Sequence, residues 1–177
     1  WNDTRSYKQA SILDKEENLR KITGNIVFPG FTAPKLLWIQ DNKPELFEQV
    51  AKVLLPASYL GYYLTGEFFM DMSDAAGTSW LDVGNRCWSE YALKASNMRS
   101  DQMPKLLEGT QVASSVSEFI ADELGIPSGV SVVAGAGDNA AAACGVGITK
   151  EGQGFVSIGT SGVLLTARDT YTPLANS

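Results

Sequence analysis

The sequence of 177 residues contains no histidine and only two cysteines. The lack of histidine excludes Ser-His-Asp triads and zinc sites that use histidine ligands. Cys87 and Cys144 form neither a CxxC pair nor any other spacing typical of a metal site. We therefore expect no protein-borne metal site in this chain.

Long apolar runs and clusters of basic residues are also missing. No stretch approaches the ~20 apolar residues of a membrane-spanning helix, and no secretory signal is recognisable. The 14 Lys and Arg residues are dispersed among 20 Asp and Glu, which gives a net charge of −6. Proteins that bind nucleic acid without sequence preference normally carry a basic cluster. The composition therefore predicts a cytoplasmic protein that binds neither nucleic acid nor membrane.

The distribution of apolar residues, Gly and Pro predicts a mixed α/β chain. Asp71 and Asp74 could be metal ligands, but helix capping and turn roles are commoner for aspartate. On helix periodicity Trp38 is expected in the core. We expect helices over residues 4–20, 34–42, 44–50, 59–64, 88–95, 117–124 and 138–144, strands over 53–55, 130–134, 155–158 and 163–166, and irregular structure over 70–78.

The stretch 130–147 carries the strongest functional signal. An apolar, β-branched run predicts a buried strand over 130–134, and Gly135 and Gly137 permit a tight turn before a helix rich in alanine. Asp138 then lies where the strand ends and the helix begins. In open α/β sheets that edge is where ligands bind.

Three interpretations of Asp138 compete. Residues 135–140 match the dinucleotide-binding pattern GxGxxA, but no acid follows the next strand to bind a ribose. Asp138 could simply cap the helix, which contributes roughly 1 kcal/mol. The turn from Gly159 to Gly162 offers backbone N–H groups and the hydroxyls of Thr160 and Ser161 to an anion. A carboxylate beside a phosphate would suit phosphoryl transfer.

Several motifs closely resemble those of the FGGY carbohydrate kinases. Residues 30–42 read Gly-Phe-Thr-Ala-Pro-Lys-Leu-Leu-Trp-Ile-Gln-Asp-Asn and satisfy the family's first signature. Trp-Asn-Asp-x-Arg at 1–5, Ser-Asp-Ala-Ala-Gly-Thr at 73–78, Glu-Gly-Thr at 108–110, Gly-Asp-Asn-Ala-Ala at 137–141 and Ile-Gly-Thr-Ser-Gly-Val at 158–163 continue the match. The resemblance implies the actin, hexokinase and Hsp70 fold, in which two ribonuclease-H-like α/β domains enclose a cleft.

The resemblance also implies roles for individual residues. Asp138 would be the catalytic base and Asn139 a sugar contact, with Asn2, Asp3 and Arg5 near the sugar end. Gly159, Thr160, Ser161 and Gly162 would bind the phosphates of ATP. Residues 1–148 would belong to the N-terminal, sugar-binding domain and 149–177 would open the C-terminal, ATP-binding domain.

The same resemblance points to ATP and Mg²⁺ as cofactors and to D-xylulose as the sugar. Another ketose, a polyol, or a non-catalytic actin-like nucleotide-binding module is the alternative, and a homodimer is the assembly considered. The family's N-terminal phosphate hairpin would precede Trp1, and its adenosine motif would follow Ser177. We therefore expect these 177 residues alone to phosphorylate nothing.

Overall fold

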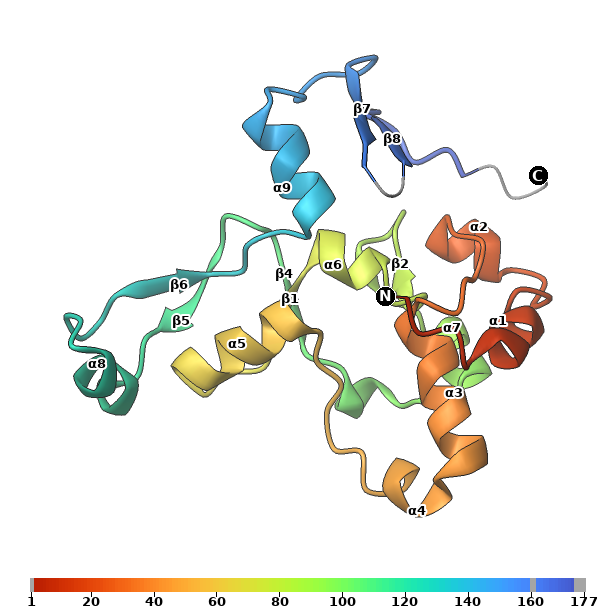
Figure 1. Ribbon diagram of the computed structural model, residues 1–177, viewed down its shortest axis with the longest axis horizontal. Coiled ribbons are helices and arrows are strands. Elements are labelled where there is room, and N and C mark those ends of the chain that lie inside the picture. The colour runs from red at the N-terminus through yellow and green to blue at the C-terminus, as the bar shows by residue number, and fades with distance from the viewer. Residues whose placement is uncertain (1, 160–161, 174–177) are drawn as a thin grey trace.

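The computed structural model describes residues 2–159 and 162–173 as a mixed α/β structure with three visible parts (Figure 1). A broad body carries the first helices, a narrow arm carries α8, β5 and β6, and α9 leads away from the body to the hairpin of β7 and β8. The helices are α1 (Tyr7–Leu13), α2 (Leu19–Thr23), α3 (Thr32–Asn42), α4 (Pro44–Phe47), α5 (Pro56–Thr65), α6 (Met72–Ala76), α7 (Glu90–Ala95), the 3-10 helix η1 (Ser100–Gln102), α8 (Glu118–Leu124) and α9 (Asp138–Gly145). The strands are β1 (Phe69–Asp71), β2 (Leu81–Asp82), β3 (Cys87–Trp88), β4 (Lys105–Leu107), β5 (Val112–Ser115), β6 (Ser131–Val133), β7 (Gly154–Ile158) and β8 (Gly162–Thr166).

The strands pair two by two. β1 and β4 run parallel, with Phe69 opposite Lys105 and Asp71 opposite Leu107. The other three pairs, β2–β3, β5–β6 and β7–β8, are antiparallel. Because parallel strands end at the same edge, the segments that follow Asp71 and Leu107 begin side by side. This edge lies in the middle of the molecule, next to α6.

Local sequence signals set several helix ends. Pro44 and Pro56 occupy the first turns of α4 and α5, where the missing N–H costs no hydrogen bond. Gly66 ends α5 in the left-handed conformation, at φ 79°. The side chains of Asp71 and Ser117 accept backbone N–H groups at the starts of α6 and α8.

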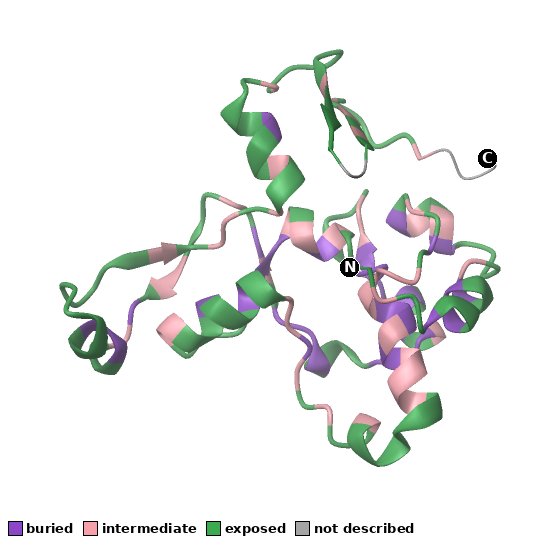
Figure 2. Ribbon diagram, viewed as in Figure 1, coloured by how far each residue is buried: buried purple, intermediate pink, exposed green. Residues whose placement is uncertain are grey.

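The largest core cluster lies in the body, where buried residues concentrate (Figure 2). Trp80, at the centre of this cluster, is 1% exposed and donates its indole N–H to the Ser96 hydroxyl at 2.7 Å. The buried members of the cluster are Ala10, Leu13, Leu19, Val27, Ala33, Leu36, Val53, Trp80, Ala92, Leu93, Met98 and Met103. The arm and the hairpin of β7 and β8 are mostly exposed.

Two predictions for the first third of the chain are wrong. The helix expected over 4–20 is two helices separated by turns over residues 14–18, where the Asp14 carboxylate accepts hydrogen bonds from Arg20 and from the Val27 N–H. The strand expected over 53–55 is an extended segment leading into α5, and the Val53 N–H bonds to the Gln102 carbonyl.

Other differences concern packing and pairing. Residues 70–78, expected to be irregular, include most of β1 and all of α6. Trp38 is half-buried rather than core, and the Arg5 guanidinium lies 4.7 Å from its ring centroid. The strand expected to be buried over 130–134 is β6, where Val133 remains 49% exposed. In the described residues β6 pairs with β5 alone, and only Val132 of this strand packs against the small cluster of Val116, Ile120 and Ala121.

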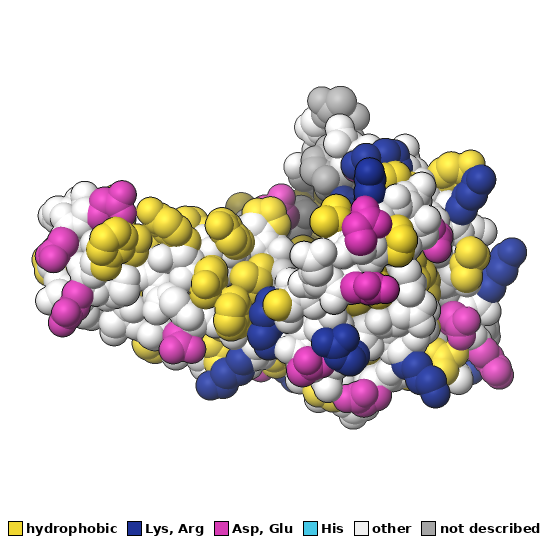
Figure 3. All heavy atoms as spheres, turned by 90° about the horizontal axis from the view of Figure 1, so that it is seen from below, with side chains coloured by type: hydrophobic (Ala, Val, Ile, Leu, Met, Phe, Trp, Pro, Cys, Tyr) yellow, Lys and Arg dark blue, Asp and Glu magenta, His cyan; other side chains and the backbone are white. Residues whose placement is uncertain are grey.

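One face of the molecule carries charges of both signs and an apolar area. Seen from below, hydrophobic side chains gather along the part formed by α5 and the arm (Figure 3). Exposed members of these elements include Tyr59, Leu60, Tyr63, Phe119 and Leu124. Basic and acidic side chains alternate over the broader part of that face. None of the described helices is long and apolar enough to cross a membrane.

Candidate functional site

Asp138 is the first residue of α9, and Gly137 is its N-cap residue. The turn and helix predicted around Gly135 and Gly137 are confirmed. The Asp138 carboxylate is exposed and accepts two hydrogen bonds from Asn139, at 2.7 Å from the backbone N–H and 3.2 Å from the side-chain amide. A carboxylate at this place is stabilised by the helix dipole and remains open to an incoming ligand.

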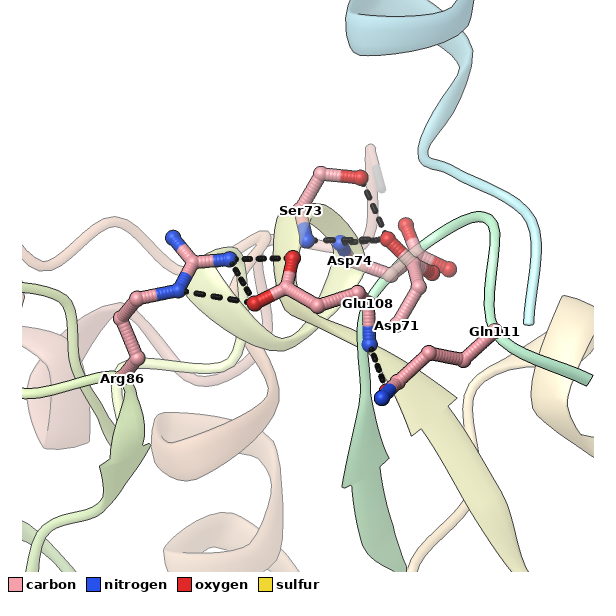
Figure 4. Close-up of polar contacts among 6 residues, drawn as sticks. All are labelled: Asp71, Ser73, Asp74, Arg86, Glu108 and Gln111. Atoms are coloured by element: carbon pink, nitrogen blue, oxygen red, sulfur yellow. Dashed lines mark hydrogen bonds and ion pairs between the residues drawn. The ribbon is translucent and has the colours of Figure 1, made fainter. Parts of the chain in front are cut away.

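The turn that precedes Asp138 lies against the start of α6. The Gly137 N–H donates to the Ser73 hydroxyl at 2.8 Å, and that hydroxyl donates to the Asp71 carboxylate. Asp71 is buried and also accepts the backbone N–H groups of Ser73 and Asp74, at 2.9 and 3.0 Å (Figure 4). Asp71 thus has the capping role that is commoner for aspartate than metal binding, although the helix it caps was not expected.

The strand end of β4 contacts the other side of the same turn. The Gly135 N–H donates to the Gly109 carbonyl at 3.0 Å, and the Ala134 N–H to the Gln111 carbonyl at 3.0 Å. A Cβ atom on Gly109 would lie 2.6 Å from the Gly135 oxygen, so only glycine fits this approach. Gly135 itself has φ 83°, which also favours glycine.

Three carboxylates, Asp71, Asp74 and Asp138, lie near one another. Burial raises the pKa of Asp74, and the negative charges of Asp71 and Asp138 raise it further. Even so, no group of three or more His, Cys, Asp or Glu side chains within residues 2–159 and 162–173 could hold a metal ion.

A hollow of about 360 Å³ opens beside the turn. Its walls come from α6, from residues 108–109 and 135–136, and from Ala140 and Cys144 of α9. Arg86 and Glu108 join at its rim, with the Arg86 Nη2 atom 2.6 Å from a Glu108 carboxylate oxygen (Figure 4). The small side chains on the α9 side keep the space open.

The residues expected near the sugar lie on a different part of the surface. Asp3 and Arg5 form an ion pair at 2.6 Å and line a hollow of about 160 Å³ with Lys35 and Trp38. Hydrogen bonds from Arg5 hold the pKa of Asp3 well below its usual range. Asn2 lines a second hollow of about 460 Å³. Neither hollow is lined by Asp138 or Asn139.

The turn expected to bind phosphate connects β7 and β8. Ile158 pairs with Gly162 at its base, and the predicted hairpin is confirmed. Gly159 and Gly162 are at the two ends of the turn, whereas Thr160 and Ser161 lie outside the described residues.

Sequence reasoning missed two parts of the site. Ser73 and Gly109 appeared only within motifs, with no role attached to either. Ser73 is 64 residues from Gly137 along the chain, so their hydrogen bond left no local sequence signal. The glycine at 109 offered the one hint of a close backbone approach.

Comparisons with known proteins agree on one family. Residues 1–145 match the domain described as "FGGY family of carbohydrate kinases, N-terminal domain". The chain is 48% identical to the xylulose kinase of Escherichia coli (strain K12) over 172 residues, which cover 97% of this chain and 35% of that protein. It is 45% identical to the xylulose kinase of Lactococcus lactis subsp. lactis (strain IL1403), over 93% of this chain and 33% of the relative.

Solved structures show the same similarity in three dimensions. A crystal structure described as a xyloylose kinase from Brucella ovis matches with a TM-score of 0.96 and 52% identity, over 100% of this chain and 37% of that one. The ligand-bound xylulose kinase from Lactobacillus acidophilus matches with a TM-score of 0.90 and 26% identity, over 98% of this chain and 36% of that one. The chain thus spans about a third of the length of these relatives. By the family match over residues 1–145 and by its fold, the chain belongs to the FGGY family of carbohydrate kinases.

Proposed function

We propose that the protein phosphorylates a sugar hydroxyl with ATP, with D-xylulose as the substrate and Asp138 as the general base. The observation that carries the proposal is an exposed carboxylate on a turn that hydrogen bonds hold from two sides. A positioned carboxylate within reach of the reacting hydroxyl is what general base catalysis needs. The xylulose kinases among the relatives supply the substrate class.

In the proposed reaction the sugar oxygen attacks the γ-phosphorus of ATP and its proton passes to the Asp138 carboxylate. The bond between the γ-phosphorus and the bridging oxygen breaks, and ADP leaves. Catalysis of this kind depends mainly on positioning and electrostatics. Mg²⁺, the proposed cofactor, would offset phosphate charge when bound, and we assign none of the described side chains to it.

Other residues enter the proposal with narrower roles. Asn139, which hydrogen bonds to Asp138, would contact the sugar beside the base. Arg5 and Asp3 offer a paired donor and acceptor next to the face of Trp38, an arrangement suited to a polyhydroxylated ligand. Asn2 would contact the sugar end of the ligand as well.

The division of the chain is also a proposal. Residues 1–148 would belong to the sugar-binding domain and 149–177 to the beginning of the ATP-binding domain, where the turn from Gly159 to Gly162 would meet phosphate. The family match that ends at residue 145 supports this boundary. We propose the cytoplasm, which supplies ATP, as the location, and the homodimer stays a prediction.

The test is an assay of ADP release by the full-length protein with a panel of ketoses and polyols. We expect D-xylulose among the best substrates and D-xylulose 5-phosphate as the product in mass spectrometry. Asp138→Asn, which keeps the shape and removes the charge, should lower kcat by about 10²- to 10⁴-fold with ATP binding retained.

The matched control is Asp122→Asn, which changes an exposed aspartate on α8. It should leave turnover unchanged. Unaltered turnover in Asp138→Asn would remove this residue from the mechanism. ATP binding without phosphorylation of any sugar by the unsubstituted protein would favour the non-catalytic actin-like module.

A further inference from the structure

We propose that Ser73 is a positioning residue for Asp138, a role that rests on the proposed function. Ser73 belongs to α6, and Asp138 begins α9, 65 positions later in the sequence. The link between them is the hydrogen bond from the Gly137 N–H to the Ser73 hydroxyl at 2.8 Å. Gly137 directly precedes Asp138, so Ser73 acts on the backbone from which the carboxylate projects.

The Ser73 hydroxyl is itself fixed in direction. The Gly137 N–H can only donate, so it uses a lone pair of the Ser73 oxygen and leaves the hydroxyl proton to point to Asp71. Asp71 is 4% exposed and is the last residue of β1, paired with Leu107 of β4. The strand pair therefore anchors Asp71, Asp71 orients Ser73, and Ser73 holds Gly137.

The fit at this contact is close. A Cβ atom on Gly137 would lie 3.0 Å from the Asp74 carboxylate and 3.6 Å from the Ser73 hydroxyl oxygen. The glycine lets the turn approach the start of α6 closely enough for the hydrogen bond. On the other side, the Gly135 N–H binds the Gly109 carbonyl at 3.0 Å. Removal of the Ser73 hydroxyl would leave the turn held by its contacts with the segment after β4 but not by α6.

The expected consequence is a shift of Asp138 with the fold preserved. Ser73 is exposed, so replacing it removes little packing. A displacement of about 1 Å in a catalytic group can cost about a hundredfold in rate. We expect Ser73→Ala to lower kcat about ten- to a hundredfold in the full-length protein, with the KM for the sugar and for ATP changed less than threefold.

The experiment compares three variants by steady-state kinetics and by hydrogen exchange of the backbone amides. Ser73→Thr keeps the hydroxyl and should restore kcat to within about threefold of the unsubstituted protein. Ser117→Ala removes the capping hydroxyl of α8, which accepts the Ile120 N–H, and controls for a lost cap elsewhere. In Ser73→Ala the peptide that contains Gly137 should exchange about tenfold faster, because its N–H loses a partner. Ser117→Ala should leave that peptide unchanged.

Each result decides a separate question. A kcat in Ser73→Ala equal to that of the unsubstituted protein overturns the positioning role, and so does failure of Ser73→Thr to restore it. If the unsubstituted protein phosphorylates no sugar, the proposed function fails and the catalytic role of Ser73 fails with it. In that case the exchange rate at Gly137 still shows whether Ser73 holds the turn, because this rate does not depend on turnover.

Discussion

Gly61 offers the sharpest test of the packing between α5 and β1. It lies inside the helix Pro56–Thr65, where replacing glycine by alanine normally stabilises by about 1 kcal/mol. Here a Cβ atom would lie 2.5 Å from the Phe69 Cζ atom and 3.1 Å from both Cε atoms. Phe69 is 4% exposed, so its ring has little room to withdraw. We expect Gly61→Ala to be destabilising, against the helix propensity.

The magnitude follows from two opposing effects. Overpacking of a filled site costs about 1–3 kcal/mol, and the propensity gain offsets about 1 kcal/mol of it. The net loss in the free energy of unfolding should be about 1 kcal/mol. With an m-value of about 2 kcal/mol/M, the urea midpoint should fall by about 0.5 M. Circular dichroism at 222 nm during urea titration measures this shift.

Two further variants isolate the contact. Gly145→Ala, in α9, places its Cβ in open space and should leave the midpoint unchanged or raise it. Phe69→Leu shortens the ring side chain, so Gly61→Ala added to it should become neutral or stabilising, with a coupling energy of about 1–2 kcal/mol. A rise of the midpoint in Gly61→Ala alone would refute the close approach of α5 to β1.

Two other predictions concern the buried Ser96 hydroxyl and the half-buried Asp74 carboxylate. Ser96→Ala should lower the free energy of unfolding by about 1–3 kcal/mol, because the Trp80 indole N–H loses its acceptor. The control variant Ser100→Ala, at an exposed site, should change the free energy of unfolding little. Equal melting temperatures for the two variants would contradict this prediction. Burial raises the pKa of Asp74 in the folded protein, so Asp74 favours the folded state when protonated, and its contribution is lost as pH rises from the unfolded pKa through the higher folded pKa. Asp74→Asn should therefore reduce the loss of stability across that pH interval and make the protein more stable at neutral pH than the unsubstituted protein. Urea midpoints measured from pH 4 to pH 7 test this. Parallel curves of urea midpoint against pH for the two proteins would rule the explanation out.

Local signals in the sequence were enough to predict several elements. The helix expected over 59–64 is the later part of α5, which ends before Gly66, and the helices expected over 117–124 and 138–144 correspond to α8 and α9. The hairpin of β7 and β8 follows from two β-rich runs around a short turn. In each case the residues that decide the structure lie within a few positions of one another.

Contacts between distant segments could not be read in the same way. β1 has three residues, and it is a strand because β4, far along the chain, pairs with it. Asp14, just after α1, accepts hydrogen bonds from Arg20 and Val27, contacts that no periodicity reveals. In the site, Asp138 was a candidate from its own turn, but the support from Ser73 and Gly109 depends on the β1–β4 edge.

The position of Asp138 at the near end of α9 has a mechanical consequence. An eight-residue helix is about 12 Å long, so tilting it by 10° about Gly137 displaces its far end by about 2 Å and Asp138 hardly at all. The segment after β8 is connected back to the body by Tyr171, whose hydroxyl donates to the Lys21 and Ile22 carbonyls at 2.8 and 3.1 Å. In the described residues a tilt of α9 about Gly137 would therefore move its far end while the Asp138 carboxylate kept its place, and the Tyr171 hydrogen bonds would resist that tilt.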